Sequence, residues 1–472
     1  MSRVPGAMLE ALRRRRPALP PPVERWPVVL TAGGRADAAP EAVAAALERI
    51  RAEALYWPAP RSGAPRPRAV AIGARGLAEA RETYPDADIA AVRDLASVEP
   101  DRLERVFGAR GPAALWAALG GVDGGGGPDP VASLAGAAGR CPWTGQPLDL
   151  AEAVEAQAFL RRAALYARGP ARFVGMSAWK RRCLRPFFIG PDGPPSQARP
   201  GAPGLRVVWG ARDENADLRV EDGFLRSVGL GLRHVPPVSL AIAPGAPYFD
   251  ATRRNAFEET VAAAHFDERL AARAAAFRAR TLALGLTKYN LPDGPALPGA
   301  NGRMRLLAPG QVAADASIRL GARPPVQTDL ALLEAARARF PEAFILYKPH
   351  PDVVTGLRSG AAAGREAARF ADRIETRASA AQCLDWADRV ATITSLMGFE
   401  ALLRGKDVTV FGRPFYAGWG LTDDVDPPVR DRRLTLDELT AAALLLHVRY
   451  IDPRSGLPAP PEIALDALAA ER

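Results

Sequence analysis

The stretch from Val390 to Phe411 most constrains the fold of this chain of 472 residues. Its first five residues are apolar or β-branched and predict a buried parallel strand, after which Ser395 caps a helix predicted over residues 396–404. Gly405 ends that helix, and residues 407–411 predict the next strand. The corner between the first strand and the helix directs backbone N–H groups at whatever binds there, which favours an anion.

A second apolar run, residues 343–347, predicts a strand that ends in the sequence KPHP. Ligands bind at the carboxyl ends of the strands in open α/β sheets. The two prolines stiffen the backbone around His350, so that its imidazole projects at the strand end and hydrogen-bonds a phosphate, while Lys348 supplies charge. A surface histidine on a rigid loop is the alternative. Together with Thr394 and Ser395, this corner predicts a site for an anionic ligand, a nucleotide above all.

The formal charge of +9 favours anionic partners such as nucleotides, phosphorylated sugars, acidic glycans or anionic lipid head groups. Nucleic acid competes with these. Apart from the basic run Arg13–Arg16, however, the positive charge is spread mostly as single arginines among acids, and no nucleic-acid-binding motif occurs, so we expect no nucleic acid. Cys141, Cys183 and Cys383 lie far apart without metal-ligand spacing, which predicts reduced thiols in a cytoplasmic setting. No run reaches the ~20 apolar residues that span a bilayer, so we expect any membrane contact to be peripheral and electrostatic.

The hydrophobic periodicity divides the chain into parts. These are residues 1–25, 26–127, 141–295, 303–430 and 431–472. The first is basic and rich in proline and predicts a disordered tail. The second holds α/β-like fragments with turns at AGG and GARG and a glycine-rich joint at its end, and we assign it no chemistry. The last predicts a helix over 436–447 and a tail.

Each of the two large middle parts alternates strands with helices, including a long helical region over 254–284, and a linker rich in proline and glycine separates them. Alternation in two blocks predicts an α/β protein with two Rossmann-like, doubly wound lobes that face a cleft. This GT-B architecture is common among sugar-nucleotide transferases. We expect an acceptor and catalytic lobe first and a nucleotide-binding lobe second.

The Glu221-Asp222-Gly223 sequence ends a short predicted strand of the first lobe. Consecutive strand side chains point to opposite faces, so we expect only one of the two carboxylates to enter the cleft, and Gly223 permits a sharp turn. A carboxylate placed there deprotonates an acceptor hydroxyl or attacks an anomeric carbon to form a covalent glycosyl intermediate. An ordinary Asp-Gly turn is the alternative. Arg226 and Ser227 in the same loop are candidates to pair with a carboxylate or a phosphate.

Glu400 lies on the predicted helix 396–404 between apolar neighbours. An unpaired carboxylate is costly to bury, so we expect Glu400 to bond either a ligand hydroxyl, such as that of a ribose, or an internal arginine. No suitably placed DxD run and no Cys/His cluster suggests a metal. Lys348, His350 and the helix N-terminus are therefore the groups expected to neutralise a leaving phosphate.

A set of motifs in order resembles those of the bacterial capsule-polysaccharide Kdo transferases, from about Cys141 to Pro453. They are VGMSAWKRR (174–182), VEDGFLRSVGLG (220–231), GLTKYNL (285–291), PGQVAADASIRLG (309–321), YKPHPDV (347–353), TSLMGFEALLRG (394–405) and GRPFYAGWGLTDD (412–424). Members of that family build a linker of β-linked 3-deoxy-octulosonic acid (Kdo) on a lipid anchor at the cytoplasmic face of the inner membrane. The resemblance implies a GT-B-like, metal-independent enzyme that needs no cofactor and uses CMP-Kdo as donor.

The resemblance also implies roles for particular residues. The HP and TS motifs resemble those that bind CMP in bacterial sialyltransferases, which assigns Lys348, His350, Thr394 and Ser395 to the nucleotide. Because family members retain the anomeric configuration, the acid before the glycine acts as nucleophile.

Asp222 is the first choice for that nucleophile and Glu221 the second. Gln311 and Arg226 would then face the Kdo carboxylate or hydroxyls.

Typical family members carry two such modules, whereas EDG, KPHP and FYAGWG each occur once here and most resemble the second module. The residues before Cys141 are therefore either a decayed first module or an unrelated cap, and a partner enzyme is one source of the first Kdo. The implied partners are CMP-Kdo, a Kdo-primed lipid or glycan, the inner membrane and other capsule assembly proteins. Two alternatives stay open: a non-catalytic scaffold that binds nucleotide or glycan, and a transferase of another CMP-activated nonulosonic acid.

Overall fold

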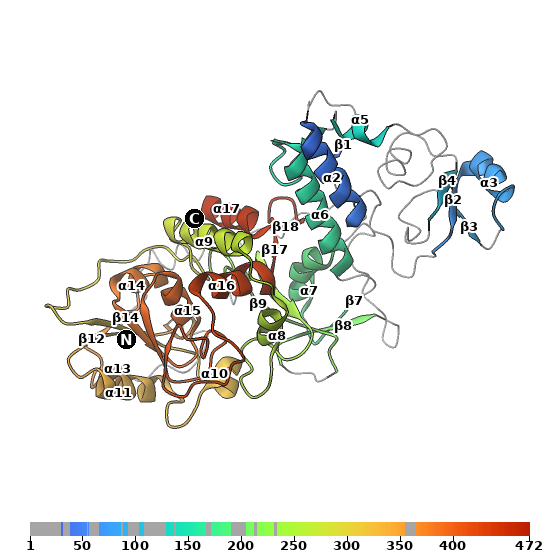
Figure 1. Cartoon of the computed structure of the whole chain (residues 1–472). Coiled ribbons are helices and arrows are strands. Elements are labelled where there is room, and N and C mark those ends of the chain that lie inside the picture. Colours follow the sequence, from blue (N-terminus) through green and yellow to red (C-terminus); the bar gives the residue numbers. More distant parts are fainter. Residues whose placement is uncertain are drawn as a thin grey trace.

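The structure is a computed structural model (Figure 1). It describes residues 30–31, 38–53, 55, 66–85, 88–92, 103–107, 129–135, 138–166, 171–189, 204–211, 215–230, 234–354 and 364–472. The tail predicted at residues 1–25 and the glycine-rich joint at 124–127 lie outside these ranges.

The second lobe is built on a parallel sheet. Its strands are β11 (Arg305–Pro309), β12 (Phe344–Lys348), β13 (Arg373–Ile374), β14 (Arg389–Thr392), β15 (Asp407–Val410) and β16 (Asp423–Asp424). The strand order is β13-β12-β11-β14-β15-β16. Successive strands of the chain are added on one side of β11 up to β13 and then on its other side from β14 onward. The topological switch point, at which such sheets bind ligands, therefore lies between β11 and β14. The strand–helix–strand unit predicted from residue 390 onward is confirmed as β14, α15 and β15.

Helices flank this sheet. They are α10 (Ala316–Gly321), α11 (Asp329–Arg339), α12 (Pro351–Val354), α13 (Gly364–Ala367), α14 (Ala380–Trp386) and α15 (Leu396–Leu403). Side-chain caps begin several of them; Thr328, for example, accepts a hydrogen bond from Ala331 N at the start of α11. The sequences of strands such as β14 are short apolar runs, because helices cover both faces of the sheet.

The first lobe has a mixed sheet in the order β18-β17-β10-β9-β8-β7. Its strands are β7 (Ala171–Val174), β8 (Leu205–Trp209), β9 (Leu218–Asp222), β10 (Ser239–Ala243), β17 (Val448–Ile451) and β18 (Pro458–Ala459). The strands β7, β8 and β9 are parallel, and β10, β17 and β18 each run antiparallel to their neighbours. The predicted α/β, GT-B-like class is confirmed, with three antiparallel strands that the local patterns did not indicate.

The helices of the first lobe are α6 (Leu150–Tyr166), α7 (Ala178–Leu184), η3 (Arg185–Phe188), α8 (Ala256–Ala263), α9 (Glu268–Ala283) and α17 (Pro461–Glu471). The single helical region predicted over 254–284 is thus two helices. The break occurs because Asp267 caps α9, where its Oδ1 accepts a hydrogen bond from Leu270 N at 2.7 Å.

Residues 431–472 hold more than the predicted helix and tail. The helix α16 (Leu436–Thr440) passes into the π-helical η5 (Ala441–His447), and the chain then adds β17 and β18 to the first lobe. The strand β17 pairs with β10 and thereby covers a sheet edge that would otherwise expose unpaired backbone groups. The end of the chain therefore completes the first lobe.

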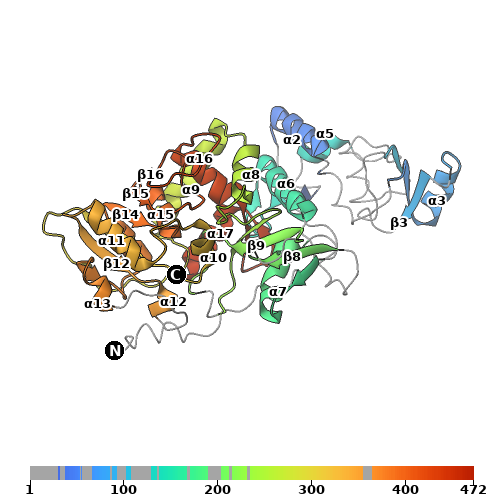
Figure 2. The ribbon, with the colours of Figure 1, turned by 90° about the horizontal axis from the view of Figure 1, so that it is seen from below.

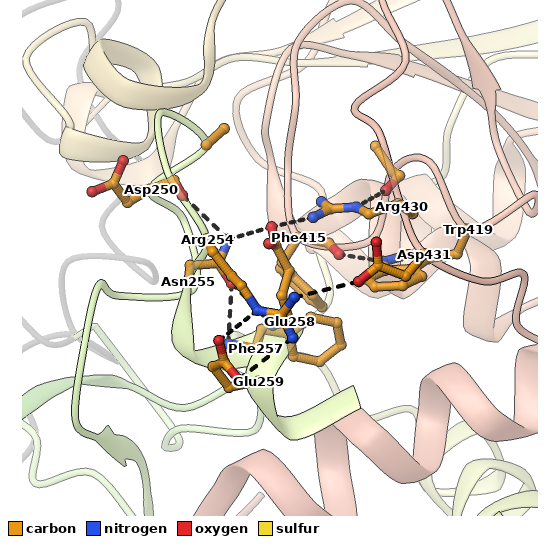
Figure 3. Close-up of polar contacts among 12 residues, drawn as sticks. Asp250, Arg254, Asn255, Phe257, Glu258, Glu259, Phe415, Trp419, Arg430 and Asp431 are labelled. Carbon is orange, nitrogen blue, oxygen red and sulfur yellow. Dashed lines mark hydrogen bonds and ion pairs between the residues drawn. The ribbon is translucent and has the colours of Figure 1, made fainter. Parts of the chain in front are cut away.

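The loop after β15 packs the second lobe against the first (Figure 3). The ring of Phe415 stacks on Phe224, with centroids 4.6 Å apart, and meets Phe257 of α8 edge-on at 4.9 Å. Arg430 from the same region forms an ion pair with Glu258 of α8. Because Phe224 directly follows the Glu-Asp-Gly turn, this shared aromatic core fixes that turn relative to the second lobe.

The described N-terminal residues form two smaller parts. The strands β1 (Leu30–Thr31), β5 (Ala138–Arg140) and β6 (Pro147–Leu148) pair with one another, and the helices α2 (Pro40–Ala52) and α5 (Pro130–Ala135) pack beside α6. The strands β2 (Ala69–Ile72), β3 (Ile89–Val92) and β4 (Arg105–Phe107) form a separate parallel sheet with α3 (Gly73–Arg81). This sheet lies farthest from the second lobe in Figure 1 and Figure 2.

The turn predicted at GARG is wrong, because these residues begin α3. The helix starts directly after β2, since Leu77 and Ala80 on it cover the apolar strand residues Ala69 and Ala71. Within the described residues, no helix combines the length and apolar character that crossing a membrane requires. Cys141, Cys183 and Cys383 are buried, unbridged thiols.

Candidate active site

A cavity of about 1480 Å³ lies between the two lobes. The first lobe contributes the end of β9 and the second lobe contributes the ends of β11, β12 and β14. The predicted site residues on its wall are Glu221, Asp222, Gln311, Lys348, His350, Thr394, Ser395 and Glu400. Asp222 and His350, which are far apart in the sequence, therefore share one groove.

Gln311 and Thr394 join the two strand ends at the switch point. Gln311 Nε2 donates to Thr394 Oγ1 at 2.9 Å, and Thr394 N donates to Gln311 Oε1 at 2.9 Å. Gln311 N also donates to Asp329 Oδ1 at 2.9 Å. Both ends of the Gln311 amide bind Thr394, so Gln311 fixes the geometry of the corner, and its contact with a Kdo carboxylate or hydroxyl stays a prediction.

Ser395 caps α15 as predicted, since its Oγ accepts a hydrogen bond from Met397 N at 3.3 Å. Tyr416 Oη donates to the carbonyl of Ser395 at 2.5 Å and reaches it across Gly398. A Cβ at Gly398 would lie 2.2 Å from that hydroxyl, so only glycine fits there. The N-terminal end of α15 opens on the cavity, where its N–H groups and its dipole favour an anion.

Lys348 and His350 lie at the end of β12. Lys348 is 9% exposed and its Nζ donates to Ala378 O at 2.6 Å; burial lowers the pKa of its ammonium group. His350 Nδ1 accepts a hydrogen bond from Asp352 N at 3.1 Å. In the neutral ring the proton is then on Nε2, which makes Nε2 the donor that a phosphate oxygen requires.

Both acids of the Glu-Asp-Gly turn are among the residues that line the cavity, whereas we expected only one of the two carboxylates to enter it. The strand β9 ends at Asp222, and strict alternation of side chains ends with it. Gly223 N donates to Ser239 O of β10 at 3.0 Å, and a Cβ at Gly223 would lie 2.2 Å from Ser239 Oγ. The close approach of these two backbones explains why a glycine follows Asp222.

The two carboxyl groups have different environments. Arg226 Nε lies 2.8 Å from Asp222 Oδ1, and the side chains are 3% and 22% exposed, so Asp222 forms an ion pair with a buried arginine. Burial, with the neighbouring charge of Asp222, raises the pKa of Glu221 to about 8. The turn therefore presents a carboxyl group paired with an arginine beside a second carboxyl group whose pKa is raised, and such a difference in environment suits two carboxyl groups to different roles.

Arg226 and Ser227, predicted to bind substrate, lie behind the cavity wall. Besides its ion pair with Asp222, Arg226 donates from Nη1 to Ser227 Oγ at 2.9 Å and to Val235 O at 2.9 Å. Ser227 Oγ donates to Gly229 O at 2.8 Å. Arg226 thus pairs with a carboxylate, as the sequence indicated, but that carboxylate belongs to Asp222. Both side chains support Asp222 and the following loop from inside the first lobe.

Glu400 bonds a backbone amide, and its expected bond to a ligand hydroxyl stays a prediction. Its Oε1 accepts a hydrogen bond from Lys288 N at 2.8 Å, and Arg404 reaches only the backbone carbonyl of Glu400, at 3.0 Å. Burial raises the pKa of Glu400. This carboxyl group thus links α15 to the segment that joins the lobes, because a backbone amide supplies the partner that burial demands.

Lys288 is a cavity residue that the sequence patterns did not single out. Its Nζ lies 5.4 Å from the ring centroid of Tyr289, which also lines the cavity with Tyr248. Burial by itself lowers the pKa of Lys288, but Tyr289, Tyr248 and Asp222 together raise it, so a cation lies beside the acids. The only sequence signal was its position in the TKYN motif before the linker.

Glu221 makes stability depend on pH. The pKa of Glu221 rises from 4.5 to about 8 in the fold, because the buried carboxyl group is favoured in its protonated form. The stability that this protonated group contributes is therefore complete below pH 4.5 and is lost as pH rises through 8. Between about pH 5 and about pH 9, we expect the wild type to lose stability relative to Glu221→Gln, by at most about 1.4 kcal/mol per pH unit. Urea unfolding of both proteins measures this difference. Parallel pH profiles would contradict it, and Glu259→Gln, at a glutamate whose side chain is 63% exposed, is the control.

Two α/β lobes enclose a cavity that is lined by the acids of the first lobe and by the switch point of the second, which defines a GT-B-like protein. Two solved structures are similar to this chain. The β-Kdo 2,7-transferase of Thermosulfurimonas dismutans KpsC is 33% identical, with a TM-score of 0.53, over 64% of this chain and 99% of that one. The β-Kdo 2,4-transferase of the same protein is 32% identical, with a TM-score of 0.56, over 64% of this chain and 98% of that one.

Sequence relatives point the same way. Residues 289–452 match the family described as "Capsule polysaccharide biosynthesis protein". The capsule polysaccharide modification protein LipA of Neisseria meningitidis serogroup A is 38% identical over 66% of this chain and 47% of its own length. The lipopolysaccharide-processing protein LpsZ of Rhizobium meliloti is 44% identical over 54% of this chain and 59% of its own length. The chain thus spans about half the length of the curated relatives it matches, and it belongs to the capsule polysaccharide family that includes these Kdo transferases.

Proposed function

We propose that this chain is a glycosyltransferase of capsule polysaccharide biosynthesis that moves Kdo from CMP-Kdo to a Kdo-primed lipid or glycan with retention of configuration. The observation that carries the proposal is the shared cavity, which has Asp222 on one wall and the N-terminal end of α15 with His350 on the other. Similarity to two Kdo transferases supports the choice of donor sugar. As proposed, the reaction uses no cofactor and no metal.

In the first step, the nucleotide lies at the switch point, with its phosphate at Ser395 and His350. The carboxylate of Asp222 attacks the anomeric carbon of Kdo while the bond from that carbon to the phosphate oxygen breaks. Glu221, which is protonated at neutral pH, gives its proton to the departing phosphate. The cation of Lys288 and the dipole of α15 offset the negative charge that develops on CMP.

In the second step, an acceptor hydroxyl attacks the same carbon and the ester bond to Asp222 breaks. Glu221, now ionised, takes the proton of that hydroxyl. Two inversions give net retention. The role of Asp222 as nucleophile fits its ion pair with Arg226, because a nucleophilic carboxylate must be ionised. We place the protein in the cytoplasm, peripheral to the inner membrane, where a lipid-linked acceptor and other capsule assembly proteins would meet it.

Incubation of the purified protein with CMP-Kdo and a synthetic Kdo-lipid tests the proposal. We expect release of CMP and an acceptor heavier by one Kdo residue. Binding of CMP without either product would favour a non-catalytic scaffold and contradict the proposal. Competition with CMP-sialic acid tests the donor, and effective competition would favour another CMP-activated nonulosonic acid.

A further inference from the structure

Lys288 lies between the loop of the proposed nucleophile and the helix at the nucleotide. Its carbonyl oxygen accepts hydrogen bonds from Arg226 N at 3.0 Å and from Ser227 N at 3.2 Å, which fixes it to the loop that follows Asp222. Its own N–H donates to Glu400 Oε1 of α15 at 2.8 Å. Both Lys288 and Asp222 line the cavity. The backbone thus holds this lysine at the level where the reacting carbon of the sugar must lie.

The ammonium group of Lys288 faces the cavity without a protein carboxylate bound to it. In the part of the chain that the structure describes, its Nζ forms no ion pair, and it lies 5.4 Å from the centroid of the Tyr289 ring. A half-buried cation that no carboxylate neutralises favours a ligand group with a negative charge. The cavity therefore offers an anion site beside Asp222, in addition to the one at the switch point.

Tyr248 adds a neutral hydrogen-bond donor to this site. It follows β10, which pairs with the strand that ends at Asp222, and its ring meets Phe224 edge-on with centroids 5.0 Å apart. Tyr248 lines the cavity, and its hydroxyl makes no hydrogen bond to any described residue. Burial raises the pKa of this hydroxyl, Lys288 opposes the increase, and Glu221 and Asp222 add to it. The phenol therefore keeps its proton at neutral pH and can donate it to an anion.

The chemistry of the proposed donor sugar supplies an anion at this level. In a 2-ulosonic acid such as Kdo, the anomeric carbon itself bears a carboxylate, which an aldose lacks. That carboxylate brings a negative charge close to both the attacking carboxylate of Asp222 and the leaving phosphate. Repulsion between these charges is strong in a cavity from which water is largely excluded. A cation beside the anomeric carbon offsets the repulsion, and a hydroxyl donor orients the carboxylate.

We propose that Lys288 and Tyr248 form the subsite for the carboxylate of the donor sugar. The ammonium group of Lys288 pairs with one carboxylate oxygen, and the hydroxyl of Tyr248 donates a hydrogen bond to the same carboxylate. The inference rests on the proposed function and adds to it the residues that select a sugar with a carboxylate on its anomeric carbon.

Calorimetric titrations with CMP and with CMP-3-fluoro-Kdo test the subsite, since the fluorine slows transfer and allows binding to be measured alone. The ratio of the affinity for the analogue to that for CMP isolates the contribution of the sugar. This ratio should fall about tenfold or more in Lys288→Met and about tenfold in Tyr248→Phe, because each loses a bond to a charged group. Lys288→Arg keeps the charge and should keep more of the ratio than Lys288→Met.

The C1 amide of the analogue separates recognition of charge from general damage. Because the amide carries no negative charge, the ratio of its affinity to that of CMP should be the same in the wild type and in Lys288→Met. Lys406→Met and Tyr84→Phe are matched controls, since neither residue lines the cavity, and both should bind every ligand as the wild type does.

An unchanged ratio for the analogue in Lys288→Met or in Tyr248→Phe would overturn the inference. Equal losses of affinity for the analogue and its amide in Lys288→Met would also overturn it. Because the titrations need no turnover, the expected pattern would support the subsite even if the wild type transferred no Kdo, an outcome that counts against the proposed function alone. Transfer of Kdo together with an unchanged ratio would count against the subsite alone.

Discussion

Asp222→Asn is expected to lower the rate of Kdo transfer about 10³-fold or more while CMP binds as tightly as before. Asparagine keeps the size of the side chain and an oxygen for Arg226, which lies 2.8 Å from Asp222 in the wild type. It lacks the negative charge that attack on the anomeric carbon needs. The loss should therefore appear in kcat, because the nucleotide lies on the opposite wall of the cavity.

Steady-state release of CMP and calorimetric titration with CMP measure the two effects separately. Asp431→Asn is a suitable control, since its side chain is 82% exposed. Unchanged turnover in Asp222→Asn would remove Asp222 from the mechanism and make Glu221 the candidate nucleophile. Loss of both turnover and CMP binding would indicate a damaged fold.

His350→Ala is expected to weaken CMP binding by about 10- to 100-fold, because a hydrogen bond to a charged group contributes roughly 1.5–3 kcal/mol. In the wild type, the bond from Asp352 N to Nδ1 leaves Nε2 as the donor toward a phosphate oxygen. Cytidine lacks the phosphate, so its affinity should be the same for both proteins. Titrations with CMP and with cytidine measure the difference.

His350→Gln should keep part of the affinity, since its amide also donates a hydrogen bond. His265→Ala is the matched control, because His265 is exposed on the first lobe and lies away from the cavity wall. Equal losses for CMP and for cytidine would contradict a phosphate contact and would place His350 near the base or the ribose.

The second lobe was predictable because its signals are local. The run from Val390 onward contains a strand, a capping serine and a helix stop in order, and each of these depends on neighbours within a few residues. The same holds for β12 and its terminal KPHP sequence. The carboxyl ends of parallel strands lie at the same edge of a sheet, so the fold class predicted that His350 and Ser395 would line the same cavity.

The first lobe was less predictable because its completion depends on distant pairing. The strand β17 pairs with β10, although some two hundred residues of chain separate them. The local sequence pattern of neither strand indicates which strand it pairs with. The closing helix predicted over 436–447 gave no indication that its last part is π-helical. Register and partner choice in a sheet are set by tertiary packing.

The partners of the polar side chains also escaped prediction. Arg226 and Gln311 were expected to bind substrate, and in the structure Arg226 forms an ion pair with Asp222 while Gln311 hydrogen-bonds Thr394. Glu400 bonds a backbone amide that no side-chain pattern reveals. A buried polar residue requires a partner, and the sequence alone does not say whether that partner is a ligand or the protein itself.

A crystal structure of the protein with bound CMP tests the central claim most directly. The account predicts that the phosphate lies within hydrogen-bonding distance of His350 Nε2 and the N-terminal end of α15, with the carboxyl group of Asp222 facing it across the cavity. A phosphate bound elsewhere, or an Asp222 side chain on a wall that does not face the nucleotide, would contradict the account.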